Sequence, residues 1–140
     1  MSTFKTFEDI EAWANARKLA HKIYLLANEG SFSRDFRLRD QVNDAAGSIM
    51  DNIAEGFERD GVKEFIQFLS ISKGSCGEVR SQLYRALDRG HISQEDFEEI
   101  KREAIHIGRQ IAKLMSYLKS TGWRGSKFVN EPDVDYEKDL

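Results

Sequence analysis

The sequence has few of the residues that interrupt helices or cross-link a chain. Its 140 residues include one proline, Pro132, and one cysteine, Cys76. Because proline breaks helix interiors, a chain without proline before position 132 can be helical over most of its length. One cysteine excludes an internal disulfide, and this usage is typical of the reducing cytoplasm.

Long apolar runs and common enzyme motifs are missing as well. No run approaches the roughly 18 apolar residues that cross a membrane, and residues 1–10 are polar and unlike a signal peptide. The sequence contains no phosphate-binding loop, dinucleotide fingerprint or nucleophile elbow. We therefore expect a cytoplasmic protein that contacts no membrane, needs no cofactor and is not an enzyme.

Charge is distributed unevenly along the chain. The net charge is −3, but residues 131–140 hold five carboxylates against one lysine, so residues 1–130 carry 20 basic and 19 acidic side chains. A near-neutral body lacks the basic excess that nucleic-acid-binding proteins usually show. We expect one globular domain over residues 1–122, followed by an irregular acidic tail over residues 123–140.

Apolar residues recur at helical spacing in four segments. The two central segments meet at Asp60-Gly61, a dipeptide that stops a helix and forms a turn. Thr6 and Ser93 each begin a capping box, while Gly30 and Gly90 end the first and third segments. These signals predict an all-α fold, an up-down-up-down bundle of four helices with 22 to 28 residues each. The helices cover about residues 7–29, 34–59, 62–89 and 94–121.

The apolar positions predict the buried face of each helix. Glycine inside a helix costs about 1 kcal/mol relative to alanine, so Gly47, Gly74 and Gly77 predict close contact within the bundle or with another subunit. The predicted core is Ile10, Trp13, Ala16, Ala20, Ile23 and Ala27; Leu38, Val42, Ala45, Ile49, Ile53 and Gly56; Phe65, Leu69, Ser72, Cys76, Val79, Leu83 and Ala86; and Phe97, Ile100, Ala104, Ile107, Ile111, Leu114 and Leu118. Large apolar residues outside these stripes predict a subunit interface. They are Phe36, Phe57, Phe68, Ile71, Tyr84 and Ile105.

Two lines of polar residues run beside the predicted core on the second and third helices, each on one helix face. One interpretation is a ligand or catalytic site. The other is a hydrogen-bonded network that fixes helix register or a subunit contact, and we favour it because no nucleophile–base pair accompanies the lines. Glu55 lies near a helix C-terminus, where the macrodipole disfavours an anion, so we expect it to pair with Arg59 or with a basic group of another helix. The predicted network is Ser48, Asn52, Glu55, Ser75, Glu78 and Gln82.

Several short motifs resemble those of one bacterial family. They are Asn52-Ile53-Ala54-Glu55-Gly56, Gly74-Ser75, Glu78 and Gln82-Leu83, with Leu38, Gln41, Ala45-Ala46, Ser48-Ile49, Phe65 and Phe68-Leu69. From position 7 to about 118 the chain is similar to the 23S rRNA intervening-sequence proteins, which are four-helix bundles. The resemblance implies a homopentamer. Through the related accessory protein of diversity-generating retroelements, it also implies contact with RNA, DNA or a nucleic-acid enzyme. Met50 and Cys76 depart from the family pattern, where proline and leucine are common.

Arginines near helix ends are the candidates for nucleic-acid contact. Arg34 and Arg37 share a helix face, and so do Arg85 and Arg89. The alternative is that these are solvated charges paired with nearby acidic residues, and the near-neutral body favours this alternative. The candidates are Arg34, Arg37, Arg39, Arg80, Arg85 and Arg89.

No metal site is predicted. Glu103 and His106 have the Glu-x-x-His spacing of di-iron bundles, but such a site needs a second copy on another helix, and the sequence has none. His106 falls off the apolar stripe, so we expect it to point to solvent or to a neighbour. His91 is expected in a loop after Gly90, and Cys76 in the core.

Two functional hypotheses follow. The leading one is a non-catalytic, homo-oligomeric scaffold that binds a protein or a nucleic acid. The rival is a small-ligand-binding protein or enzyme that uses the polar residues around Asn52 and Glu55.

Overall fold

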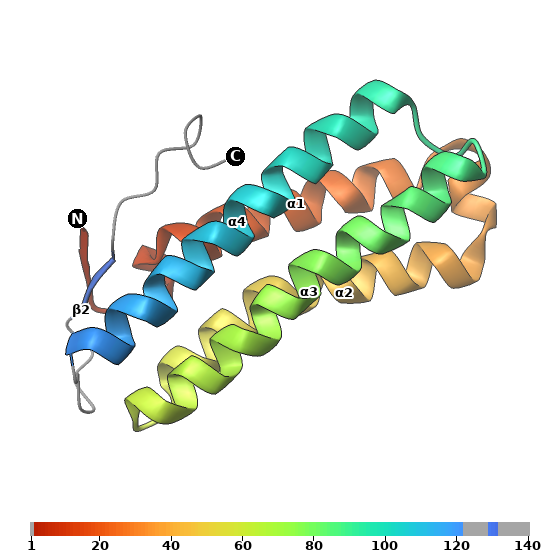
Figure 1. Ribbon diagram of the computed structural model, residues 1–140. Coiled ribbons are helices and arrows are strands. Elements are labelled where there is room, and N and C mark those ends of the chain that lie inside the picture. The colour runs from red at the N-terminus through yellow and green to blue at the C-terminus, as the bar shows by residue number, and fades with distance from the viewer. Residues whose placement is uncertain (1, 122–128, 132–140) are drawn as a thin grey trace.

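The computed structural model describes residues 2–121 and 129–131, and four long helices make up most of it (Figure 1). The helices are α1 (Glu11–Ala27), α2 (Phe36–Glu58), α3 (Val62–Asp88) and α4 (Gln94–Thr121). Two short 3-10 helices, η1 (Phe7–Asp9) and η2 (Gly30–Arg34), precede α1 and α2. Two strands, β1 (Ser2–Phe4) and β2 (Val129–Glu131), pair antiparallel.

Consecutive helices run antiparallel, and α1 closes the bundle against α4 (Figure 1). The α2–α3 pair shares the most extensive interhelical contact. The predicted all-α, up-down-up-down bundle is confirmed. The predicted helix length is wrong for α1, which has 17 residues, while the other helices have 23, 27 and 28. Within the described ranges, no helix combines the length and the apolar character needed to cross a membrane.

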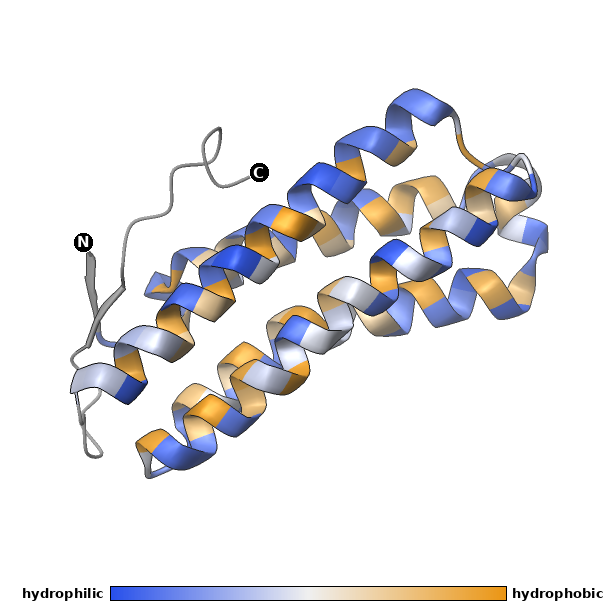
Figure 2. Cartoon of the chain, in the orientation of Figure 1, coloured by the Kyte–Doolittle hydropathy of each residue, from blue (hydrophilic) through white to orange (hydrophobic). Residues whose placement is uncertain are grey.

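The core forms from the apolar stripes, which face inward on all four helices (Figure 2). Every predicted core position on α2, α3 and α4 is buried. The prediction is partly wrong on α1, where Ala12 is buried while Trp13 and Ala20 are only half-buried. The small Ala12 suits the closely packed interior. The larger Trp13 lies at the margin, with its ring centroid 5.1 Å from that of Phe7.

The first helix is short because its predicted boundary signals belong to other elements. The Asp9 carboxylate accepts hydrogen bonds from the backbone N–H groups of Lys5 at 3.0 Å and Thr6 at 3.4 Å, so this motif caps η1. Gly30 adopts φ +53° and begins η2 instead of ending α1. The second capping motif lies where it was predicted, because the Ser93 hydroxyl accepts a hydrogen bond at 3.0 Å from the N–H of Asp96, in the first turn of α4.

Most of the predicted irregular tail lies outside the described residues. Its described part, β2, pairs with β1 in the register Ser2 to Glu131 and Phe4 to Val129, so this part is a strand. The pair lies at the end of the bundle that also holds the α2–α3 turn (Figure 1). The domain boundary at residue 122 stays a prediction.

The large apolar residues predicted for a subunit interface divide into buried, half-buried and exposed groups. The prediction is wrong for Phe57, which belongs to the core: it is 2% exposed, and its ring centroid lies 5.9 Å from that of Phe65. Phe68 and Ile105 are half-buried. The exposed members are Phe36, Ile71 and Tyr84.

At Gly56, α2 packs closely against α3. A Cβ added there would lie 2.6 Å from Cβ of Phe68 and 3.1 Å from the ring of Phe65, which is too close for a side chain to fit unchanged. Farther along the same interface, the buried Ser72 hydroxyl donates to the carbonyl of Ile49 at 2.6 Å. Glycine is therefore needed at position 56 for packing.

The other glycines predicted to make close contacts behave differently. A Cβ at Gly47, Gly74 or Gly77 would meet nothing within 4 Å. The prediction of close contact inside the bundle is therefore wrong at these three positions, because their α-carbons face open space. Contact with another subunit stays a prediction for them.

The substitution Gly56→Ala should destabilise the protein by about 1–3 kcal/mol, because the new methyl group must displace Phe68. The matched substitution Gly47→Ala, on the same helix but in open space, should stabilise it by up to about 1 kcal/mol, because alanine is the better helix former. Chemical denaturation followed by circular dichroism measures both. Effects of equal sign and size would contradict the packing assignment.

Candidate functional site

Part of the predicted polar network forms at the middle of the α2–α3 interface. The Asn52 side-chain amide donates to both the carbonyl and the hydroxyl oxygen of Ser48, each at 2.8 Å. The Ser75 hydroxyl donates to the Ser48 hydroxyl oxygen at 3.0 Å. Three of the six predicted residues thus form one hydrogen-bonded cluster, in which the Ser75–Ser48 bond connects α3 to α2 and the Asn52 bonds stay within α2.

The other three predicted residues take no part in these hydrogen bonds. Glu78 and Gln82 line a shallow depression of about 360 Å³, which also includes Ser48. Gln82 is 8% exposed, and its buried Oε1 has no hydrogen-bond partner in the described part of the chain. Glu55 is exposed and accepts a hydrogen bond at 3.0 Å from Arg59, one of the two kinds of partner expected for it.

The substitution Asn52→Ala should lower the free energy of unfolding by about 0.5–1.5 kcal/mol, because it removes the link from Asn52 to Ser48. Glu55→Ala, on the same helix, should change it by at most about 0.5 kcal/mol, because an exposed ion pair one turn apart contributes little. Urea denaturation distinguishes the two. An equally large effect at Glu55 would show that this residue also belongs to the network.

The six candidate arginines do not form one surface. Arg34 and Arg37 are exposed near the start of α2, whereas Arg80 lies on α3 where it faces α4. The other three contact neighbouring side chains: Arg39 bonds to Asp40 at 3.0 Å, Arg85 to Gln41 at 3.3 Å, and Arg89 to Asp35 at 2.9 Å. Pairing with acidic groups, the alternative weighed from the sequence, therefore describes Arg39 and Arg89.

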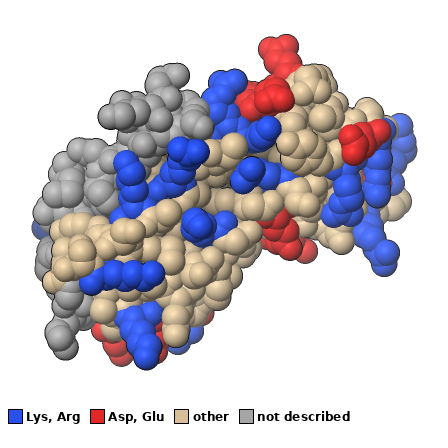
Figure 3. All heavy atoms as spheres, viewed as in Figure 1, with Lys and Arg blue, Asp and Glu red and all other residues tan. Residues whose placement is uncertain are grey.

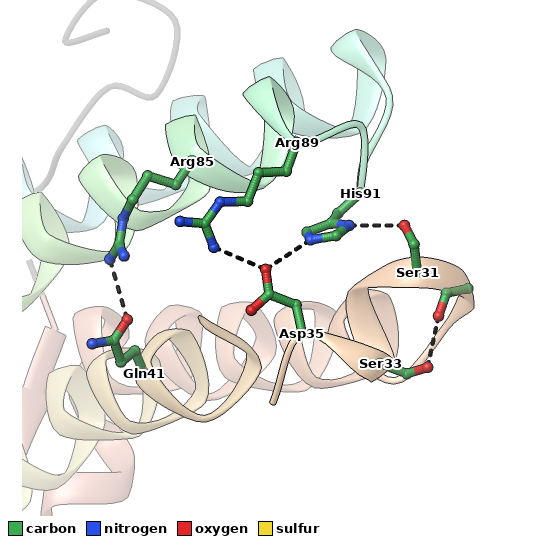
Figure 4. Close-up of polar contacts among 8 residues, drawn as sticks. Ser31, Ser33, Asp35, Gln41, Arg85, Arg89 and His91 are labelled. Atoms are coloured by element: carbon green, nitrogen blue, oxygen red, sulfur yellow. Dashed lines mark hydrogen bonds and ion pairs between the residues drawn. The ribbon is translucent and has the colours of Figure 1, made fainter. Parts of the chain in front are cut away.

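A cluster that the sequence did not reveal joins the two connections at one end of the bundle (Figure 4). His91 Nε2 lies 2.9 Å from Asp35 Oδ2, and His91 Nδ1 lies 2.8 Å from the hydroxyl of Ser31. Arg89 donates to the same oxygen of Asp35 at 2.9 Å. The interacting residues are 54 to 60 positions apart in the sequence, so no local motif could indicate the cluster.

The C-terminus of α3 positions His91. Gly90 adopts φ +74°, its N–H donates to the carbonyl of Leu87 at 3.0 Å, and the N–H of His91 donates to that of Ala86 at 2.9 Å. This pair of bonds is a Schellman motif, which requires a left-handed residue and so favours glycine. The turn brings the imidazole onto the buried Phe32, where the ring centroids are 5.3 Å apart.

Serine, histidine and aspartate in contact suggest a nucleophile relay, but the geometry argues against one. In catalytic triads the serine contacts Nε2 and the aspartate Nδ1, and here the two nitrogens are exchanged. The His91 side chain is only 10% exposed, and Asp35 is shared with Arg89. We interpret the cluster as a clamp that holds the α1–α2 and α3–α4 connections together.

The clamp should be sensitive to acid. Hydrogen bonds from His91 and then Arg89 hold the pKa of the Asp35 carboxyl below its usual range. A carboxyl with a lowered folded-state pKa stabilises the fold fully above its unfolded pKa of about 3.9, and this contribution is lost as the pH falls through the folded pKa.

The substitution Asp35→Asn should therefore lower the melting temperature at about pH 7, and its difference from the wild type should shrink at pH values below about 4. Thermal melts across this pH range measure the difference. Asp51→Asn, at an exposed position of α2, is the control for removing a carboxylate outside the clamp. A difference that stays constant into the acid range would contradict the clamp.

A groove of about 360 Å³ between α1 and α4 contains the residues considered for a metal. His106 lines the groove and is 7% exposed. The side chain was expected to point either to solvent or to a neighbour, and the first of these expectations is wrong. Glu103 also lines the groove and pairs with Lys22 at 2.5 Å. Nowhere in the described ranges do three or more histidine, cysteine or acidic side chains lie where they could hold a metal ion.

Comparisons with known proteins agree with this architecture. A family model described as 23S rRNA-intervening sequence protein matches residues 8–113, whereas a comparison with curated proteins finds no significant match. Among solved structures, a crystal structure from Bacteroides thetaiotaomicron is described as a protein with unknown function from the S23 ribosomal protein family. It is similar with a TM-score of 0.68 at 20% identity, over 74% of this chain and 97% of that chain. At this identity the likeness shows the four-helix fold alone.

Proposed function

The chain belongs to the 23S rRNA-intervening sequence protein family, and from that premise we propose that it is a non-catalytic, homo-oligomeric scaffold that binds nucleic acid or a protein that processes it. The bundle supplies a rigid body with a filled core. A partner would therefore bind to the outer faces of the helices.

Exposed apolar side chains are the observation that carries the assembly part of the proposal. Side chains of this size normally enter a core, and here the described core is already built from the inward stripes. Apolar surface that remains in water favours association with a partner. The exposed set, at 44% exposure or more, is Tyr24, Leu25, Phe36, Ile71 and Tyr84.

A second copy of the same chain is the partner that needs no further component. Self-association through one repeated contact gives a closed ring when the rotation closes. The number five rests on the family resemblance alone. Non-catalytic action is proposed because the hydrogen-bonded residues described above connect helices and loops.

Small-ligand binding is the second candidate function, and one observation favours it. The buried Oε1 of Gln82 in the α2–α3 depression has no partner in the described part of the chain, and a ligand that donates a hydrogen bond could satisfy it. Mass spectrometry of the intact protein under native conditions would detect such a ligand.

Light scattering coupled to size-exclusion chromatography should give a molar mass several times that of one chain at micromolar concentration. Ile71→Glu should reduce that mass, because it places a charge in an apolar contact, while the circular dichroism spectrum stays helical. Ser116→Glu, an exposed substitution on α4, is the matched control. A wild-type protein that is monomeric under these conditions would refute the assembly.

A further inference from the structure

A groove of about 410 Å³ runs between α3 and α4. Lys73 and Arg80 line it from α3, and Arg109 lines it from α4. Seven positions separate the two α3 residues, so they lie on the same side of the helix about 10 Å apart along its axis. The groove therefore presents basic groups from both walls and at two levels along its length.

The charge of this groove has one sign. No carboxylate is among the residues that line it, although the whole chain carries a net charge of −3. Figure 3 shows the α3–α4 face, with lysine and arginine side chains gathered along its middle. The Cys76 thiol lines the groove as well, and burial raises its pKa to about 12, so it stays neutral. The lining therefore holds no negative charge that would neutralise the lysine and the two arginines.

Arg80 supplies a second, independent observation. Its Nε is buried and has no hydrogen-bond partner in the described part of the chain. A buried donor on a charged group is costly to leave unpaired. The guanidinium group matches the oxygens of a phosphate, with which it can form two parallel hydrogen bonds. An anionic acceptor in the groove would satisfy this donor.

The rest of the lining selects among anionic partners. Apart from the weakly accepting thiol of Cys76, the lining side chains offer donors and apolar surface and no hydrogen-bond acceptor. A peptide would bring backbone N–H groups that need acceptors, whereas the polar atoms of a phosphodiester are all acceptors. The lining is also open, because a Cβ at Gly77 would meet nothing within 4 Å, and one at Gly108 would meet Cys76 at 3.8 Å.

We propose that this groove binds the phosphodiester backbone of a nucleic acid, with Lys73, Arg80 and Arg109 as the phosphate-binding residues. This inference rests on the proposed function, of which it specifies the nucleic-acid site. Of the six arginines predicted from the sequence, it keeps Arg80 and leaves out the other five, three of which are held by neighbouring side chains. Because only the backbone is contacted, binding is independent of base sequence.

The test uses the full-length, assembled protein and a fluorescently labelled single-stranded RNA, titrated at several potassium chloride concentrations. The plot of log affinity against log salt should be steep for the wild type. Arg80→Gln combined with Arg109→Gln should make this negative slope shallower by about 1.4, since each neutralised phosphate of a single strand contributes about 0.7 to its magnitude. Arg109→Gln alone should make the slope shallower by about 0.7. This residue is exposed, so the single variant keeps the fold.

The matched control is Arg34→Gln combined with Arg37→Gln, which removes the same charge from the exposed start of α2 and should leave the slope unchanged. A DNA strand of the same length should bind within a few-fold of the RNA. The proposal is overturned if the salt dependence of binding becomes shallower in the control variant and stays unchanged in the groove variants. Binding that ignores salt, no binding at low salt, or equal competition by polyglutamate would also overturn it. Light scattering on the same samples measures the molar mass, and so tests the proposed oligomer separately from nucleic-acid binding.

Discussion

The close packing of α2 against α3 is the constraint on which the rest of the structure depends. At Gly56 the absence of a side chain lets the backbone meet Phe65 and Phe68 directly. Farther along, the hydroxyl of Ser72 reaches the backbone of Ile49. At this separation short side chains can connect the two helices, as the Ser75 hydroxyl does by donating to that of Ser48. The remaining helices, α1 and α4, complete the core against this hairpin and against each other.

The sequence predicted the core of α2, α3 and α4 because helical periodicity is a local property that a single buried face imposes on the chain. The prediction was partly wrong on the first helix, for a physical reason. A large apolar residue such as Trp13 dominates a hydrophobicity pattern, but the interior position went to the small Ala12. The same limit explains Gly30, which local rules assign to a helix end and which begins a 3-10 helix.

The polar contacts show where sequence reasoning stops. Ser48 and Asn52 are four residues apart on one helix, so their contact follows from spacing alone. The clamp of Asp35, Arg89 and His91 depends on how two distant connections meet, and no spacing rule encodes that. Of the basic residues in the groove, the sequence indicated only Arg80. Lys73 and Arg109 look like ordinary surface charges until the packing of α3 against α4 brings them to one groove.

The two ends of the bundle are chemically unlike. One end holds the α1–α2 and α3–α4 connections, which the clamp joins, and the other holds the α2–α3 turn and the β1–β2 pair (Figure 1). Copies related only by rotation all point the same way along the symmetry axis. The ring proposed above would therefore have two different faces, whichever way the bundle lies relative to the axis. Two such rings can stack head to tail without limit, but head to head only as a closed pair.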